Sequence, residues 1–452
     1  MENSRNSRKG DHVKRITTSL EVIRVKSRGC LQHLSKFIIT GGKPLEGTIT
    51  VSGAKNAVLP IIAASLLCSE PIQLDDAPDL LDVNVMNQII SALGASVERN
   101  GSTLKIHARE IDCIEAPYDL VSQMRASIVA MGPLLARNGH VRISHPGGCA
   151  IGSRPINLHL KGLEALGAEV KMDHGFLDVS SKGLKGARIY LDYPSVGATE
   201  NIMMAAAMAQ GTTLIENAAQ EPEIVDLATF LNEMGGKVRG AGTSIIHIEG
   251  VREFHGATHT VIPDRIEAGS YLLIVAATGG DVLVQNVIAD HLKPLIAKME
   301  EAGIHMLEEG DGIRISGDGV YNAVDVKTQV HPGFPTDLQA PFMAFLTRAR
   351  GTGLITETVF ENRFMHVDEL KRMGADIKIE GRSAIVQGIQ RLNAAPVTAT
   401  DLRAGAALIL AALTAEGTTG IRGIHHIERG YEKVEEKLSR LGANIVREES
   451  VS

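Results

Sequence analysis

The segment HPGGCAIGSRPINLH, residues 145–159, combines a thiol, an arginine and two histidines within a glycine-rich stretch. Cys149 follows two glycines directly and stands five residues before Arg154. Neighbouring cations and backbone N–H groups lower the pKa of a thiol, so a cysteine in such a loop can transfer a proton near neutral pH. A cysteine taken alone is more often a small buried residue. The surroundings of Cys149 favour a catalytic role.

Charged or small polar residues stand at the start of six apolar stretches that are expected to form helices. A helix N-terminus attracts anions, because it carries a partial positive charge and unpaired N–H groups. Cations there oppose the helix dipole, and such a local conflict is typical of functional sites. We expect the six starts to meet in one cleft that binds a small anionic substrate. The residues at these starts are Lys55 with Asn56, Arg125, Ser195 with Val196, Asp264 with Arg265, Thr336 with Asp337, and Asp401 to Arg403.

An internal repeat positions these helix starts. In each copy a helical stretch ends in Leu or Met, or in one case Ala. A glycine follows directly, and two short strands come after it. A glycine there is typical of a helix C-terminus, where a left-handed backbone is accessible without a Cβ. Each unit is expected to run strand, helix, strand, helix, strand, strand, with the first helix buried, and six units predict two α/β domains of three units each. The marker glycines, 68 to 73 residues apart, are Gly94, Gly167, Gly235, Gly303, Gly374 and Gly442.

Composition excludes several functional classes. The chain has 452 residues, which favours two to three domains. It has no Trp, only 3% aromatic residues and a net charge of -7, which argue against a general nucleic-acid-binding protein. Its four cysteines show no CxxC spacing, so reduced thiols are expected. No apolar run is long enough to cross a membrane.

Residues 1–36 form a basic extension without the apolar centre of a signal peptide, and we expect it to be disordered. Nucleic-acid binding through this extension is the weakest alternative, because its cations lack interleaved aromatic residues. The histidines show no metal-ligand spacing, so no metal site is expected. Glu357, Glu361 and Asp368 are interpreted as surface or hinge charges.

Ten short motifs now identify a family. Between Phe37 and Glu448 the chain resembles the UDP-N-acetylglucosamine enolpyruvyl transferases (1-carboxyvinyltransferases), within the EPSP synthase superfamily. The resemblance implies an inside-out α/β barrel of two domains, one spanning residues 55–262 and the other residues 37–54 plus 263–452. The motifs, in chain order, are SGAKNA, MRAS, PGGCAIGSRPINLH, PSVGAT, EPEIVD, PDRIEAG, HPGFPTDLQA, ETVFENRFMH, TDLRA and HIERGYE.

The family's reaction transfers the enolpyruvyl group of phosphoenolpyruvate to the 3′-hydroxyl group of UDP-N-acetylglucosamine and releases phosphate. It is the first committed step of peptidoglycan synthesis and the target of fosfomycin. The resemblance therefore implies these two small-molecule substrates, no organic cofactor and no metal. It also implies a cytoplasmic enzyme, monomeric or weakly associated, without a nucleic-acid or membrane partner.

The resemblance also implies roles for individual residues. Cys149 protonates C3 of the enolpyruvyl group and can form a covalent adduct, and Asp337 is the base. Lys55, Arg125 and Arg429 face the phosphate, with Asn56 beside Lys55, and Arg403 faces the carboxylate; Lys55 and Arg403 are counted as catalytic. The nucleotide sugar is expected to contact Arg125, Arg154, Pro155, Ile156, Asn157, Leu158, Tyr193, Pro194, Ser195, Val196, Asp337 and Val359.

Three departures from the family pattern leave every charged catalytic group in place. Asn157 stands where Asp is common, Val129 where some members have Trp, and Ala150 where some have Thr. Two alternatives remain. The shikimate-pathway enolpyruvyl transferase shares the repeats but lacks PGGCxxGxRPxxLH. A catalytically idle UDP-sugar sensor that regulates wall synthesis would have lost the thiol, Asp337 or a phosphate-binding cation.

Overall fold

The computed structural model describes residues 35–144, 151–152 and 155–449, and its strands form five mixed four-stranded sheets, one antiparallel three-stranded sheet and a two-stranded ribbon. Five sheets share one plan, in which an outer strand pairs in parallel with its neighbour and the remaining pairs are antiparallel. In the three-stranded sheet, a parallel bridge between Glu115 and Arg142 takes the position of the outer strand. The shared plan confirms the six α/β units expected from the sequence.

Three of these sheets lie between Ile72 and Thr260. Buried and exposed side chains alternate along their central strands, because each sheet packs one face on helices. In sheet order the strands are β13 (Thr258–Thr260), β3 (Ile72–Asp75), β5 (Thr103–His107) and β4 (Ser96–Asn100); β6 (His140–Ser144), β8 (Phe176–Ser180) and β7 (Glu169–Asp173); and β11 (Lys237–Arg239), β12 (Ile245–Glu249), β10 (Thr212–Glu216) and β9 (Arg188–Tyr190).

The other three sheets and the ribbon combine β1 and β2 with strands between Gly280 and Glu448. The sixth repeat is one strand short, and β1 from the start of the chain lies between β24 and β25 in its place. β1 begins at Lys36, one residue inside the stretch assigned to the extension. The strands are β15 (His305–Glu309), β16 (Gly312–Gly317), β14 (Gly280–Gln285) and β2 (Leu45–Thr50); β17 (Val326–Lys327), β18 (Thr352–Thr356), β20 (Ser383–Gln387) and β19 (Asp376–Glu380); β22 (Val397–Thr398), β24 (Thr418–Arg422), β1 (Lys36–Thr40) and β25 (Asn444–Glu448); and the ribbon of β21 (Leu392–Asn393) and β23 (Ala415–Glu416).

The first helix of every unit is buried, as its apolar sequence predicted. In two units this helix is preceded by a 3-10 turn. The buried helices are α2 (Lys55–Ala64), η2 (Arg125–Ala130) with α5 (Met131–Asn138), α7 (Val196–Ala206), α9 (Arg265–Thr278), η4 (Thr336–Leu338) with α11 (Gln339–Leu346), and α13 (Leu402–Thr414).

The second helix of each unit is amphipathic and covers the outside. The marker glycine after each of these helices has φ between 90° and 116°, which confirms the predicted helix ends. The outer helices are α3 (Leu81–Ala92), α6 (Asn157–Ala165), α8 (Pro222–Glu233), α10 (Lys293–Glu301), α12 (Val367–Arg372) and α14 (Val434–Arg440); shorter segments are η1 (Ser65–Leu67), α4 (Tyr118–Val121), η3 (Ala289–Leu292) and η5 (Ile424–Arg429).

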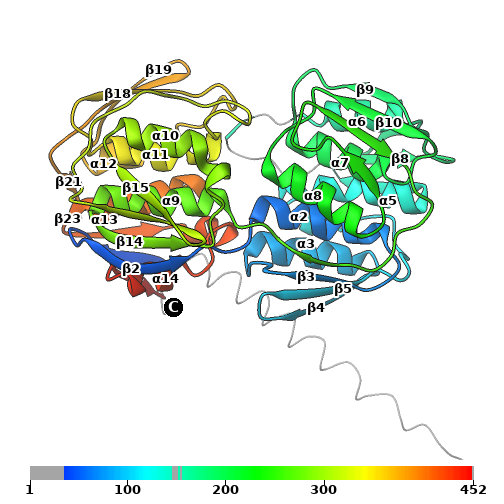
Figure 1. The fold of residues 1–452 in the computed structure, drawn as a ribbon, viewed down its shortest axis with the longest axis horizontal. Coiled ribbons are helices and arrows are strands. Elements are labelled where there is room, and N and C mark those ends of the chain that lie inside the picture. Colours follow the sequence, from blue (N-terminus) through cyan, green and yellow to red (C-terminus); the bar gives the residue numbers. More distant parts are fainter. Residues whose placement is uncertain (1–34, 145–150, 153–154, 450–452) are drawn as a thin grey trace, which may run out of the picture.

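Two separate hydrophobic cores divide the chain. One core draws on residues from Ala54 to Val261, and the other on Phe37 to Val51 together with Ile266 to Ile445. We take the parts of the chain around these cores as the first and the second domain. In Figure 1 they form two lobes, each with helices inside and sheets outside.

The chain crosses between the domains along two adjacent segments. Ala54 N–H donates to Ile262 O (2.7 Å), and Asp264 N–H donates to Ser52 O (2.9 Å). A Cβ on Gly53 would lie 1.9 Å from Asp76 O, so the crossing requires glycine there. The paired crossings fix where the two domains hinge.

Within the described part of the chain, no helix combines the length and the apolar character needed to cross a membrane.

Candidate active site

A cavity of about 900 Å³ lies between the two domains. The starts of all six buried helices contribute to its lining, which confirms their expected convergence. Both domains therefore direct helix N-termini and cationic side chains into one space, an arrangement that favours anions. The contributing residues are Lys55 and Asn56, Arg125, Ser195 and Val196, Arg265 and Ile266, Thr336 and Asp337, and Asp401 to Arg403.

One carboxylate in this cavity joins cations from both domains. Asp82, at the start of α3, lies 3.3 Å from Lys55 Nζ and 2.8 Å from Arg429 Nε. Its side chain is only 6% exposed. Burial raises the pKa of Asp82, but Lys55 and Arg429 lower it by more, so the net pKa lies below the usual value and the carboxyl stays ionised. We call Lys55, Asp82 and Arg429 the cross-domain group.

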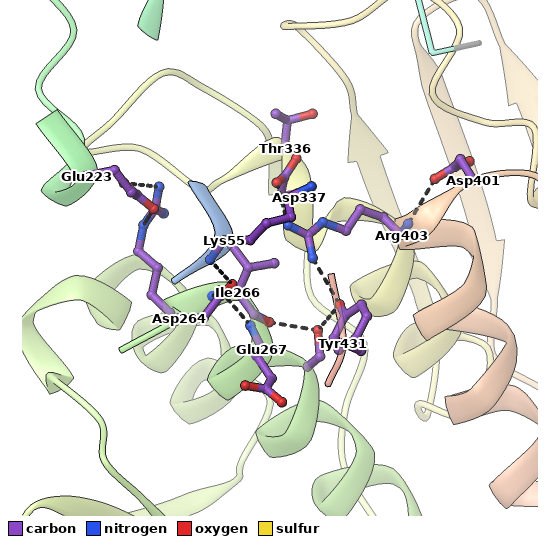
Figure 2. A network of polar contacts seen from close by, with 12 residues as sticks. Lys55, Glu223, Asp264, Ile266, Glu267, Thr336, Asp337, Asp401, Arg403 and Tyr431 are labelled. Atoms are coloured by element: carbon purple, nitrogen blue, oxygen red, sulfur yellow. Dashed lines mark hydrogen bonds and ion pairs between the residues drawn. The ribbon is translucent and has the colours of Figure 1, made fainter. Parts of the chain in front are cut away.

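A second carboxylate is held between two cations of the second domain alone. Asp337 Oδ2 lies 2.8 Å from Arg403 Nη2, and its Oδ1 lies 2.7 Å from Arg363 Nη2. Arg403 Nη1 also donates to the Tyr431 hydroxyl (3.3 Å), and Figure 2 shows Arg403 extended between these partners. We call Arg363, Asp337 and Arg403 the single-domain group.

Electrostatics in the single-domain group bear on the expected base. Burial raises the pKa of Asp337, but Arg403 and Arg363 together bring it well below its usual value. In this arrangement Asp337 is an ionised hydrogen-bond acceptor with little affinity for a proton. A substrate anion that binds the two arginines would weaken their hold on Asp337 and raise its basicity.

Local capping explains how Arg403 stands at the start of a buried helix. The Asp401 carboxylate accepts hydrogen bonds from the backbone N–H groups of Arg403 and Ala404 at 2.9 and 3.1 Å. The cap satisfies the helix end and adds a negative charge, so a cation in the first turn becomes tolerable. Asp264 caps α9 in the same way, immediately before Arg265.

Glu357 corrects one interpretation made from the sequence. It is 1% exposed and is not a surface charge. Its carboxylate accepts hydrogen bonds from the hydroxyl groups of Thr328 and Thr336 and from the N–H groups of Val359 and Phe360. The acid shapes the loop that presents Val359 to the cavity, because buried carboxylates require such partners.

Most residues expected to contact the nucleotide sugar line the cavity, and one does not. Ile156 is buried in the core of the first domain. Cys149 and Arg154 lie outside the described residues. Ile151, two residues after Cys149, accepts a hydrogen bond from Asn362 N–H of the second domain (3.0 Å). The lining residues of this set are Arg125, Pro155, Asn157, Leu158, Tyr193, Pro194, Ser195, Val196, Asp337 and Val359.

A second buried ion pair joins the domains near the hinge. The Arg265 guanidinium binds both carboxylate oxygens of Glu223, at 3.0 and 3.2 Å. Glu223 is the third residue of EPEIVD and lies in the first turn of α8, and both side chains are at most 10% exposed. Two ion pairs therefore join the domains: Glu223–Arg265, which is buried, and Asp82–Arg429, in which the arginine side chain is 34% exposed.

A family model described as EPSP synthase (3-phosphoshikimate 1-carboxyvinyltransferase) matches residues 39–438. The chain belongs to the EPSP synthase family. The match confirms at the level of the family the resemblance seen in the sequence.

Relatives within this family carry a more specific name. The chain is 60% identical to UDP-N-acetylglucosamine 1-carboxyvinyltransferase 1 of Caldanaerobacter subterraneus, over 91% of this chain and 99% of the relative. It is 56% identical to UDP-N-acetylglucosamine 1-carboxyvinyltransferase 2 of Carboxydothermus hydrogenoformans, over 92% and 99% of the two chains.

Solved structures of the family share the fold. The enolpyruvyl transferase NikO from Streptomyces tendae superimposes with a TM-score of 0.83 at 26% identity, covering 92% of this chain and 99% of that one. EPSP synthase from Acinetobacter baumannii gives a TM-score of 0.71 at 18% identity, covering 92% and 100% of the two chains. This second likeness concerns the fold alone.

Sequence reasoning missed two residues at the centre of the site. Arg363 stands within ETVFENRFMH, a motif used for the resemblance, yet it received no role. Asp82 has the ordinary appearance of an acid in the first turn of a helix. No local signal singles it out, because the segment DLLDVNVM holds a second acid, Asp79, which is exposed.

Proposed function

We propose that this chain transfers the enolpyruvyl group of phosphoenolpyruvate to the 3′-hydroxyl group of UDP-N-acetylglucosamine and releases phosphate. The observation that carries the proposal is the cavity, in which two cation pairs lie around one space. Phosphoenolpyruvate carries two anionic groups, a phosphate and a carboxylate. Enolpyruvyl transfer is also the reaction after which the relatives at 56% to 60% identity are named.

The two cation pairs suit the two anionic groups. Lys55 provides an ammonium group and Arg429 a planar guanidinium group as hydrogen-bond donors for the phosphate. Arg125 lines the same cavity. Arg403 and Arg363 present two planar guanidinium groups, which match a carboxylate because each can bind two oxygens at once. Phosphoenolpyruvate would then lie with its reactive C2 between the two groups.

The nucleotide sugar is proposed to occupy the part of the cavity formed by residues 155–158 and 193–196. Ser195 caps α7 and, with Val196, exposes a helix start to the cavity. Asn157 retains a carbonyl acceptor for a uracil N–H donor, so its replacement of Asp is expected to have a modest effect. The sugar 3′-hydroxyl would point to Asp337.

The proposed chemistry has two stages. The 3′-oxygen bonds to C2 while its proton passes to Asp337 and C3 takes a proton from Cys149. The Cys149 thiolate then takes a proton back from C3, the C3–H electrons form the double bond to C2, and the bond from C2 to the phosphate oxygen breaks. Phosphate leaves with that electron pair, and Asp337 returns its proton to the released phosphate or to water. Without substrate, Arg403 and Arg363 lower the pKa of Asp337. Asp337 gains basicity when the substrate carboxylate binds these two arginines.

Phosphate release from phosphoenolpyruvate, measured with and without UDP-N-acetylglucosamine, tests the function. We expect release that requires the nucleotide sugar and that collapses in Cys149→Ser and Asp337→Ala. Shikimate 3-phosphate is the control acceptor, and turnover with it in place of the nucleotide sugar would overturn the proposed substrate.

The same assay separates the enzyme from a catalytically idle sensor. Calorimetric binding of UDP-N-acetylglucosamine to a folded wild-type chain that releases no phosphate would favour the sensor. Both substrates are cytoplasmic metabolites, so we place the enzyme in the cytoplasm and expect it to act as a monomer or weak oligomer. Sedimentation with both substrates present checks the oligomeric state.

A further inference from the structure

Asp82 has no role in the reaction described above, although it is among the most constrained side chains of the cavity. It is 4% exposed and lines the cavity between Lys55 and Arg429. An acid that merely complements a helix dipole lies in solvent beside the first turn. Asp82 instead turns inward to two cations from different domains.

The geometry gives this carboxylate a specific task. Two cations repel each other, so Lys55 and Arg429 need a shared negative charge to converge on one point. Arg429 stands at the end of η5 in the second domain, whereas Lys55 begins α2 in the first. Their common partner therefore defines a cation pair that exists only while the two domains are in contact.

We propose that Asp82 is a positioning residue for the phosphate of phosphoenolpyruvate, holding Lys55 and Arg429 together across the domain boundary. This inference rests on the proposed function. An ammonium group has three N–H donors, so Lys55 can keep Asp82 as a partner while it binds phosphate. Asp82 itself does not touch the reacting atoms.

The charge of Asp82 also keeps Lys55 protonated. Burial lowers the pKa of Lys55, Asp82 raises it, and Arg403 and Arg429 lower it again. Without the Asp82 charge, Lys55 would lose its proton at a lower pH and bind phosphate less well. The charged groups that face Lys55 are Asp82 on α3, Arg429 on η5, Arg403 on α13 and Asp337 on η4.

Asp82→Asn tests the proposal in the full-length enzyme. At saturating UDP-N-acetylglucosamine, we expect kcat/KM for phosphoenolpyruvate to fall about ten- to hundredfold, the effect of a lost charge-assisted hydrogen bond. The alkaline limb of its pH profile should move to lower pH. The KM for UDP-N-acetylglucosamine should change by less than about twofold.

Two further variants control the experiment. Asp79→Asn removes an exposed carboxylate three residues away and should leave both KM values and the pH profile unchanged. Asp82→Glu retains the charge and should keep the alkaline limb near that of the wild type. Its longer side chain shifts the shared point, so inorganic phosphate, used alone as a calorimetric probe, should bind less tightly.

An unchanged pH profile and phosphoenolpyruvate KM in folded Asp82→Asn would overturn the proposal. Equal losses for both substrates would also overturn it, because they indicate a structural role. If Asp82→Asn does not fold, unaltered binding of inorganic phosphate to Asp82→Glu has the same consequence. Absence of wild-type turnover would instead contradict the proposed function, and phosphate binding would still test the cation pair.

Discussion

The cross-domain group and the single-domain group have the same composition, one carboxylate between two cations, but differ in what assembles them. Arg363, Asp337 and Arg403 all belong to the second domain, so folding of that domain brings them together. The cross-domain group needs both domains in contact. The single-domain group therefore needs only its own domain to fold, whereas the proposed phosphate site needs contact between the two domains.

This difference gives the two groups different requirements for binding one substrate. A site within one domain can recognise the carboxylate in any arrangement of the domains. If phosphate binds at the cross-domain group, as proposed, its recognition requires contact between the domains, because Arg429 belongs to one domain and Lys55 and Asp82 to the other. Variants of each group should therefore differ in which kinetic constant they change.

The largest effect is expected at the centre of the single-domain group. Asp337→Ala should lower kcat about a hundred- to ten-thousandfold, the usual contribution of a general base. Calorimetry should still detect binding of UDP-N-acetylglucosamine. Asp376→Ala, at an exposed position on β19, is the control and should retain full activity. A loss below tenfold in Asp337→Ala would contradict the base assignment.

Arg363→Gln should have the next largest effect. We expect kcat/KM for phosphoenolpyruvate to fall about ten- to hundredfold, because one of two carboxylate donors is lost. Activity that needs ionised Asp337 is lost as the pH falls through its lowered pKa. Removing Arg363 raises that pKa, so the acid limb should move to higher pH.

The exposed Arg372 provides the matched control. Arg372→Gln should change neither kcat/KM for phosphoenolpyruvate nor the acid limb of the pH profile. An acid limb that stays in place in Arg363→Gln would show that the group does not set the pKa of Asp337.

Glu223→Gln tests domain contact without touching either group. Arg265 would keep a buried charge without its ionic partner, and the free energy of unfolding, from urea titration, should fall by about 3–5 kcal/mol. Glu216→Gln breaks a surface pair with Arg188 within one domain and should leave the free energy of unfolding almost unchanged. Equal losses in the two variants would remove the distinction drawn between buried bridging pairs and surface pairs.

The smallest effect is expected beside the hinge, at His259. Burial lowers its pKa, but hydrogen bonds to Asp226 (3.1 Å) and Glu233 (2.7 Å) raise it above the usual value. Its stabilisation is complete below the unfolded pKa of about 6.5 and is lost as the pH rises through the higher folded pKa.

His259→Gln should therefore lower stability by about 1–2 kcal/mol at pH 6 and by less at pH 9. Urea titrations at both values measure the difference, with the half-exposed His140→Gln as the control. A loss that is equal at both pH values would contradict a charged His259.

The internal repeat made most of the fold predictable from the sequence. Six glycines at a nearly constant interval predicted six helix ends, and all six have the left-handed backbone. What the repeat could not show is which strand pairs with which. β2 and β13 precede the buried helices of their own units in the chain, but β2 pairs with β14 and β13 with β3.

The candidate site shows the same division. Lys55, Arg125, Asp337 and Arg403 could be predicted because each stands at the start of an apolar helix, a local feature. Asp82 and Arg363 could not, because their importance comes from partners that are distant in the chain. Arg429 lies 347 residues from Asp82, and no spacing rule connects them.

By itself, then, the sequence determined the six units, their buried helices, the helix ends and the cations at the helix starts, since each depends on residues close together in the chain. Only the tertiary structure decided the exchange of strands between units, the burial of Glu357 and the assembly of the two groups. Helix ends and apolar periodicity are local properties. A carboxylate bound by two cations instead requires segments that are distant in the chain to come together. The packing of those segments decides it, within the second domain for Asp337 and between the two domains for Asp82.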